Sequence, residues 1–204
     1  MVLLETRNMF AHGLHRECYI HPEIKTLCIK IITKGDLTEQ KREQRMYKRL
    51  EKEHIPLEMI PKCHGVIDTS LGVGTVFDLI QDHNGEVSKT LEYYLASNEI
   101  LLSNLPDLSN AFYSFKEYLL KNCIITMNLK PKNILYKKIN KMSGKLFIVD
   151  SLGNSDFFPV SDYFTFLARN KIQRKWDRFE RSLLNKYKTN EALYDMLNSH
   201  QERL

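Results

Sequence analysis

A lysine stands inside an apolar run near the start of the chain. Lys30 lies in residues 26–32, a β-branched stretch that predicts a strand. A charge in such a strand is costly unless an anion lies beside it. The helix expected next carries Glu43, the natural counter-ion, and Glu39 one turn earlier as its substitute. This pair fits a plain structural ion pair, or a site for an anionic ligand such as a nucleotide, which the net charge of +5 permits.

A second group of polar side chains lies near the middle of the chain. Asn133 ends the segment Asn128-Leu-Lys-Pro-Lys-Asn, and Asp150 follows seventeen residues later at the end of an apolar run. Residues 134–139 and 145–149 predict a hairpin closed by Ser143 and Gly144, which would bring Asn133 and Asp150 together. Amide and carboxylate oxygens are hard ligands suited to magnesium. Taken singly, Asn133 fits a turn residue and Asp150 a turn cap.

These segments resemble motifs of the protein kinases. The 128–133 segment is similar to the kinase catalytic loop, in which an Asp is followed five residues later by an Asn. The resemblance makes Asn133 a magnesium ligand and Lys130 the lysine near the transferred phosphate. Phe147-Ile-Val-Asp150-Ser-Leu-Gly resembles the Asp-Phe-Gly segment, and Asp150 would hold the magnesium that bridges the phosphates.

The N-terminal part carries further points of resemblance. Leu27-Cys-Ile-Lys30 is similar to the Val-Ala-Ile-Lys segment, whose lysine binds the α- and β-phosphates and is oriented by the helix glutamate, here Glu43. Residues 10–19 stand where the phosphate-covering loop belongs. That loop has one glycine, Gly13, instead of three, and Arg16 would add charge to its backbone amides.

The end of the N-terminal part corresponds by the same resemblance to the kinase hinge. Residues 77–81 would contact adenine, with Phe77 and Leu79 as the binding residues. The implied cofactors are therefore ATP and Mg²⁺.

The chain as a whole resembles the YrbL family, named for the PhoP regulatory network, whose members look like small kinase-like proteins. The resemblance covers residues 8–182 and is carried by residues 13–22, Asn133, residues 150–154 and residues 168–176. A link to PhoP-type regulation is implied by this resemblance alone.

Position 128 departs from the kinase pattern. Asn128 stands where active kinases have the catalytic Asp, and an amide does not accept a hydroxyl proton as a carboxylate does. It can still orient a hydroxyl, and phosphoryl transfer depends mostly on positioning and charge. The segment after Gly153 has no Ala-Pro-Glu match and is short, which argues against an ordinary protein substrate.

The expected fold is α+β, a minimal two-lobed kinase-like arrangement. Residues 1–82 form the small lobe, with one helix capped by Asp36 and five strands near residues 2–5, 17–20, 26–32, 61–67 and 74–80. Residues 83–204 form a reduced helical lobe around the hairpin, including a helix that ends near Asn122.

A long helix is expected after Pro159, with a cap at Ser161 or Asp162. Its apolar stripe is Phe164, Ala168, Ile172, Trp176, Phe179, Leu183 and Tyr187, and Trp176 is its core anchor. Its other faces are basic, which predicts a solvated surface or a docking face for a phosphate-rich or acidic partner: Arg169, Lys171, Arg174, Lys175, Arg178 and Arg181.

Several other classes of function are disfavoured. The four cysteines contain no Cys-x-x-Cys pair, and neither a signal peptide nor an apolar run of about 20 residues is visible, which predicts a reduced cytoplasmic protein without a membrane partner. The cations form no long tract, which argues against nucleic acid. His12, His15, Cys18 and His21 recur every three residues, but residues three apart on a strand point to opposite faces, which argues against zinc.

Three functional hypotheses follow. The first is a phosphotransferase that acts on a small or unusual acceptor. The second is a weakly active or inactive pseudokinase whose nucleotide-bound state regulates a partner protein. The third is a basic adaptor that uses its C-terminal helix.

Overall fold

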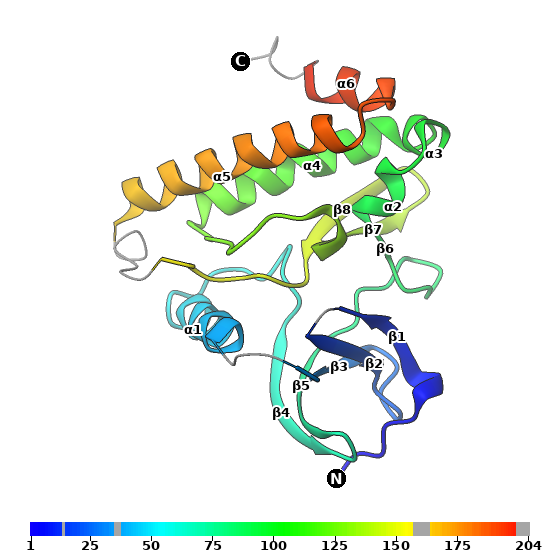
Figure 1. The fold of residues 1–204 in the computed structure, drawn as a ribbon, viewed down its shortest axis with the longest axis vertical. Coiled ribbons are helices and arrows are strands. Elements are labelled where there is room, and N and C mark those ends of the chain that lie inside the picture. Colours follow the sequence, from blue (N-terminus) through cyan, green and yellow to red (C-terminus); the bar gives the residue numbers. More distant parts are fainter. Residues whose placement is uncertain (14, 35–37, 157–163, 199–204) are drawn as a thin grey trace. The chain divides into compact units, whose positions relative to one another are not determined.

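The computed structural model describes residues 1–13, 15–34, 38–156 and 164–198. It has a mixed α+β fold and divides into two compact units, Met1–Gln81 and Asp82–Leu204 (Figure 1). The caps expected at Asp36, Ser161 and Asp162 lie outside the described residues.

The described part of the first unit is an antiparallel sheet with one α-helix. The strand order is β1-β2-β3-β5-β4, and a 3₁₀ turn, η1 (Thr6–Asn8), precedes the sheet. The other elements are β1 (Met9–His12), β2 (Arg16–Ile20), β3 (Leu27–Ile32), α1 (Thr38–Lys52), β4 (Cys63–Thr69) and β5 (Gly72–Asp78).

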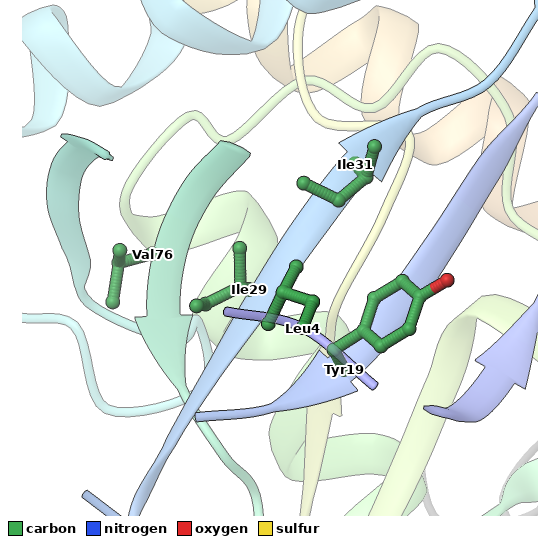
Figure 2. Close-up of a cluster of buried hydrophobic side chains, with 5 residues drawn as sticks. All are labelled: Leu4, Tyr19, Ile29, Ile31 and Val76. Carbon is green, nitrogen blue, oxygen red and sulfur yellow. The ribbon is translucent and has the colours of Figure 1, made fainter. Parts of the chain in front are cut away.

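The pairing register shows which side chains lie on each of the two faces of this sheet. Ile29 lies opposite Val76 and Tyr19, and these side chains pack with Leu4 and Ile31 into a buried cluster (Figure 2). Successive residues of a strand point to opposite faces. Lys30, which lies opposite Thr75, and the neighbouring Phe77 therefore face the other way.

The start of the chain differs from the expectation of a strand over residues 2–5. Val2 makes only an isolated bridge to Thr69, and the backbone N–H of Leu4 donates to Ser70 Oγ at 3.0 Å. Leu4 inserts into the sheet core, and the 3₁₀ turn then redirects the chain. The first strand is therefore β1, and its residues 10–12 lie in the segment expected to form the phosphate-covering loop.

The β4–β5 hairpin is offset from the predicted ranges by about two residues. Its turn falls at Ser70 and Leu71, where Thr69 Oγ1 donates to the carbonyl oxygen of Gly72 at 2.6 Å. Gly72 has a φ of 107°, a left-handed conformation that glycine adopts readily. This hydroxyl-stabilised turn determines the register, and a pattern of apolar residues alone does not specify it.

The second unit contains a three-stranded sheet, ordered β6-β7-β8, and five α-helices in its described part. The elements are β6 (Lys89–Thr90), α2 (Leu91–Leu95), α3 (Asn98–Leu102), α4 (Leu105–Lys121), η2 (Pro131–Asn133), β7 (Ile134–Asn140), β8 (Ser143–Ile148), α5 (Thr165–Lys186) and α6 (Glu191–Asn198).

Helices α4 and α5 enclose an aromatic core. Trp176 is fully buried, as expected for the core anchor of α5, and its ring centroid lies 4.7 Å from that of Phe112 and 5.7 Å from that of Phe179. Helix α4 ends at Lys121 with Asn122 as its C-cap, where its end was predicted. Phe164, the first residue of the predicted stripe, is instead 59% exposed because it precedes the first turn of α5.

The β7–β8 hairpin forms, but its turn lies at Lys141 and Met142, two residues before the predicted one. Gly144 belongs to β8 and lies against the buried ring of Tyr136, so a Cβ there would be 2.4 Å from the ring. Gly144 therefore allows close packing against this ring, whereas the sequence predicted that it would form the turn.

Candidate functional site

The first group of candidate residues lines a cavity of about 800 Å³ within the first unit. Helix α1 and the following loop form one wall, and strands β3, β4 and β5 form the other. Lys30 and Phe77 contribute from the sheet, and Glu43 contributes from the helix. Arg16 of β2 lines it as well, so the structure brings together three of the residues expected to handle phosphate and one of those expected to contact adenine.

Glu43 is the buried acid of α1. Its side chain is 6% exposed, and its Oε2 accepts a hydrogen bond from Arg16 Nη1 at 2.9 Å. Arg16 was expected to meet phosphate, but in this structure its guanidinium, 13% exposed, pairs with Glu43. Glu39, the substitute candidate, is exposed. A guanidinium and a carboxylate that are both so little exposed to solvent attract each other more strongly than they would at the surface.

Lys30 lies over an aromatic face. Its Nζ is 4.4 Å from the ring centroid of Phe77, within the range of a cation–π interaction. Phe77 is 3% exposed and also packs near the ring of Tyr47, with centroids 5.7 Å apart. The ring thus holds the ammonium group of Lys30 against the wall of the cavity.

The remaining candidates of the first unit lie outside the cavity lining. Leu79 is 7% exposed, and its backbone N–H donates to the carbonyl oxygen of Thr26 at 2.8 Å. Gly13 lies in the β1–β2 connection, and its N–H donates to the carbonyl oxygen of Arg16 at 2.7 Å. A Cβ at Gly13 would meet its nearest neighbour at 3.7 Å, an ordinary contact, so packing does not require a glycine there.

The second group of candidates lies in the second unit, at the open end of the β7–β8 hairpin. Ile134 pairs with Ile148, so Asn133 and Asp150 leave the hairpin close to each other. Asn133 Nδ2 donates to Ser151 Oγ at 3.0 Å, and Asp150 Oδ1 accepts from the Ser151 N–H at 2.7 Å. The amide donor of Asn133 is thereby engaged, which leaves its oxygen, the hard ligand, on the opposite side of the group.

Backbone hydrogen bonds join this hairpin end to the segment that contains Asn128. The Met127 N–H donates to the carbonyl oxygen of Ser151 at 2.7 Å, and the Gly153 N–H donates to that of Ile125 at 2.9 Å. Ser151 and Gly153 both have positive φ, 65° and 112°. Asn128 and Lys130 are exposed, so both are accessible to a ligand of this unit.

Two lysines of α5 complete this region, and the sequence reading assigned them to a solvated face. Lys171 is 8% exposed and bonds to Asn154 Oδ1 and the carboxylate of Asp156. Lys175 Nζ donates to the carbonyl oxygen of Met127 at 2.7 Å. Burial lowers the pKa of Lys175 to about 8, and the nearby charge of Lys171 adds to this effect. Their four-residue spacing places them on one side of the helix, but no sequence signal named their partners.

Two further observations bear on the predicted classes of function. Among the described residues, no group of three or more His, Cys, Asp or Glu side chains is arranged to hold a metal ion. Across the same described residues, no helix combines the length and the apolar character that crossing a membrane requires.

Comparison with known proteins places the chain in a family. A family model described as PhoP regulatory network protein YrbL matches residues 2–184. The chain belongs to the YrbL family. The YrbL protein of Escherichia coli is 33% identical over 182 residues, which cover 88% of this chain and 86% of that protein, and the YrbL protein of Shigella flexneri gives the same values. The family resemblance expected from the sequence is thereby confirmed.

Proposed function

We propose that this YrbL-family protein is a kinase-like protein that binds ATP and Mg²⁺, with phosphoryl transfer to a small or unusual acceptor as its activity. Asn133 and Asp150 would hold the metal, Lys30 would bind phosphate, and Glu43 would orient Lys30. Magnesium held by these residues would supply positive charge against the charge that develops during transfer.

The arrangement of Asn133, Ser151 and Asp150 is the observation that carries the proposal. The Ser151 hydroxyl and N–H connect the amide of one residue to the carboxylate of the other. A neutral amide oxygen and a carboxylate oxygen at the end of one hairpin match the ligand preference of Mg²⁺, which uses few protein ligands and retains several waters. The family match indicates no activity, but the name of the family refers to the PhoP regulatory network and supports a regulatory setting.

Calorimetric titration with ATP, in magnesium and in EDTA, tests the metal site. We expect magnesium-dependent binding that falls at least about tenfold in Asp150→Asn, because the variant loses a charged oxygen ligand. Asp195→Asn, which changes an exposed carboxylate of α6, is the matched control. Equal ATP affinity in both variants, or binding unaffected by EDTA, would contradict the proposed ligands.

A pseudokinase that regulates a partner protein is the second candidate, and Asn128 favours it. An amide at this position orients a hydroxyl but does not take its proton. Transfer from radiolabelled ATP by the wild type and by Asn128→Asp separates the two candidates. A phosphotransferase retains measurable turnover in the wild type, and Asn128→Asp raises it by about 10²-fold or more, the scale of general-base catalysis. ATP binding with no turnover in either protein would favour the pseudokinase.

A further inference from the structure

Residues 125–127 and 151–153 lie side by side in the second unit and are called the paired segments below. An antiparallel bridge joins their two central residues, both of which are buried, and backbone hydrogen bonds of 2.7 and 2.9 Å lie on either side of it. Because antiparallel segments run in opposite directions, the residue that follows one segment comes next to the residue that precedes the other. Asn128 and Asp150 therefore leave the paired segments at the same end.

Helix α5 bonds to the chain at both paired segments. Lys175 Nζ donates to the carbonyl oxygen of Met127, the last residue of the first segment, at 2.7 Å. Lys171, one turn earlier, is 8% exposed and bonds to Asn154 and Asp156, which come soon after the second segment. Residues four apart on a helix lie on the same side of it. One side of α5 therefore holds an end of each segment.

These two ammonium groups are costly to bury. Burial is the main cause of the lowered pKa of Lys175, and the nearby charge of Lys171 adds to it. Apolar side chains in the same places would pack without this cost. A charged donor, however, fixes its acceptor in a definite direction, and its hydrogen bond is about twice as strong as a neutral one. The two lysines therefore fit a role in holding particular oxygens in place.

We propose that Lys171 and Lys175 are positioning residues of the proposed nucleotide site. By holding the paired segments to α5, they keep Asn128 and the proposed metal ligand Asp150 in register. This role rests on the proposed function for its chemistry, although the contacts themselves lie entirely within the second unit. Such support matters because a displacement of about 1 Å can slow a reaction by about 10²-fold.

Amide hydrogen exchange followed by NMR tests this role without any nucleotide. In Lys175→Met, the N–H groups of Met127 and Gly153 should exchange at least about tenfold faster, because a hydrogen bond to a charged group no longer opposes opening of the paired segments. Amides in the middle of α4, which report global unfolding, should change by no more than about twofold. Lys175→Arg keeps a cationic donor and should restore most of the protection.

Arg174→Met is the matched control, because it removes an exposed cation from the same helix. The paired segments of this variant should exchange at the wild-type rate. Unchanged exchange in Lys175→Met, or equal acceleration in Arg174→Met, would overturn the proposal. Acceleration of the α4 amides to the same extent would also overturn it, since it would indicate a general loss of stability.

Calorimetric titration with ATP separates the failure of this proposal from the failure of the nucleotide site. Lys171→Met and Lys175→Met should each weaken magnesium-dependent ATP binding at least about tenfold, because Asp150 is no longer held in place. Arg174→Met should bind as the wild type does. Faster local exchange in Lys175→Met, together with a wild type that binds no ATP, would refute the nucleotide proposal alone. Magnesium-dependent binding that both lysine variants retain in full would refute the positioning proposal alone.

Discussion

The two units use partly or fully buried cations in different ways. In the first unit, Arg16 pairs with the carboxylate of Glu43 beside an open cavity, and one carboxylate oxygen is left unpaired. In the second unit, Lys171 and Lys175 bond to oxygens of the 127–156 region. The first arrangement leaves a buried oxygen without a hydrogen-bond partner, whereas the second ties α5 to the segments that carry Asn128 and Asp150.

The two units also differ in how completely side chains fill their interiors. The Trp176 core of the second unit is filled by aromatic rings from α4 and α5. In the first unit, Leu50 is 1% exposed yet lines the cavity. A hollow unit and a filled unit should respond differently to the same kind of substitution.

Removal of the aromatic core should produce the largest effect. We expect Trp176→Ala to lower the free energy of unfolding by about 3–5 kcal/mol, the range for deletion of a large buried aromatic side chain. Leu50→Ala should cost about 2 kcal/mol, the low end for its type, because one side of the Leu50 side chain faces the cavity. Urea unfolding followed by circular dichroism measures both. Equal losses would remove the distinction between a hollow and a filled unit.

Two glycine substitutions compare how tightly the sheets of the two units are packed. A Cβ at Gly144 would lie 2.4 Å from the Tyr136 ring, and one at Gly74 would lie 2.5 Å from Ile29 Cγ2. At Gly144 three atoms of Tyr136 would lie within 2.6 Å of the new Cβ, whereas at Gly74 the second contact is the terminal Cδ1 of Ile31 at 2.8 Å, which can move more easily. We therefore expect about 3 kcal/mol of destabilisation for Gly144→Ala and about 1 kcal/mol for Gly74→Ala, the two ends of the overpacking range.

Urea unfolding followed by circular dichroism also checks the glycine pair. Trp176, the single tryptophan, provides a separate fluorescence signal for the second unit. The transition seen by fluorescence should move for Gly144→Ala. A larger loss for Gly74→Ala would show that the sheet of the first unit is the more rigid one.

The smallest expected effect is the pH dependence contributed by Lys175. Its pKa is about 8 in the folded protein, against an ordinary value of 10.5. Between these values the unfolded chain binds more protons, so a rise in pH favours the folded state. The wild type should therefore gain stability relative to Lys175→Met from pH 8 to 10.5, and the difference should be flat below pH 8.

Denaturant unfolding at stepped pH measures this difference. Lys141→Met, which removes an exposed lysine from the β7–β8 turn, shows how far removal of any surface lysine changes the same curve. A difference between the wild type and Lys175→Met that stays constant over the whole range would contradict the burial of this ammonium group.

Local patterns predicted much of the secondary structure. Strands β2 and β3, helix α4, the hairpin and the core role of Trp176 agree with the alternation and spacing of apolar residues. Short elements with caps of their own were missed. Helix α6, for example, follows Asn190, whose side chain accepts from the Leu193 N–H at 3.2 Å and donates to the carbonyl oxygen of Leu95 at 3.0 Å.

The amino-acid sequence by itself determined the family and the hairpin between Asn133 and Asp150. It also showed that α1 carries an acid, Glu43, that could pair with the strand lysine Lys30. Tertiary structure alone decided that Glu43 pairs with Arg16, that Lys171 is buried, and that a cavity lies beside Leu50. The reason is physical. Periodicity reports which way a side chain points, but partners and voids depend on how closely elements distant in the sequence pack together.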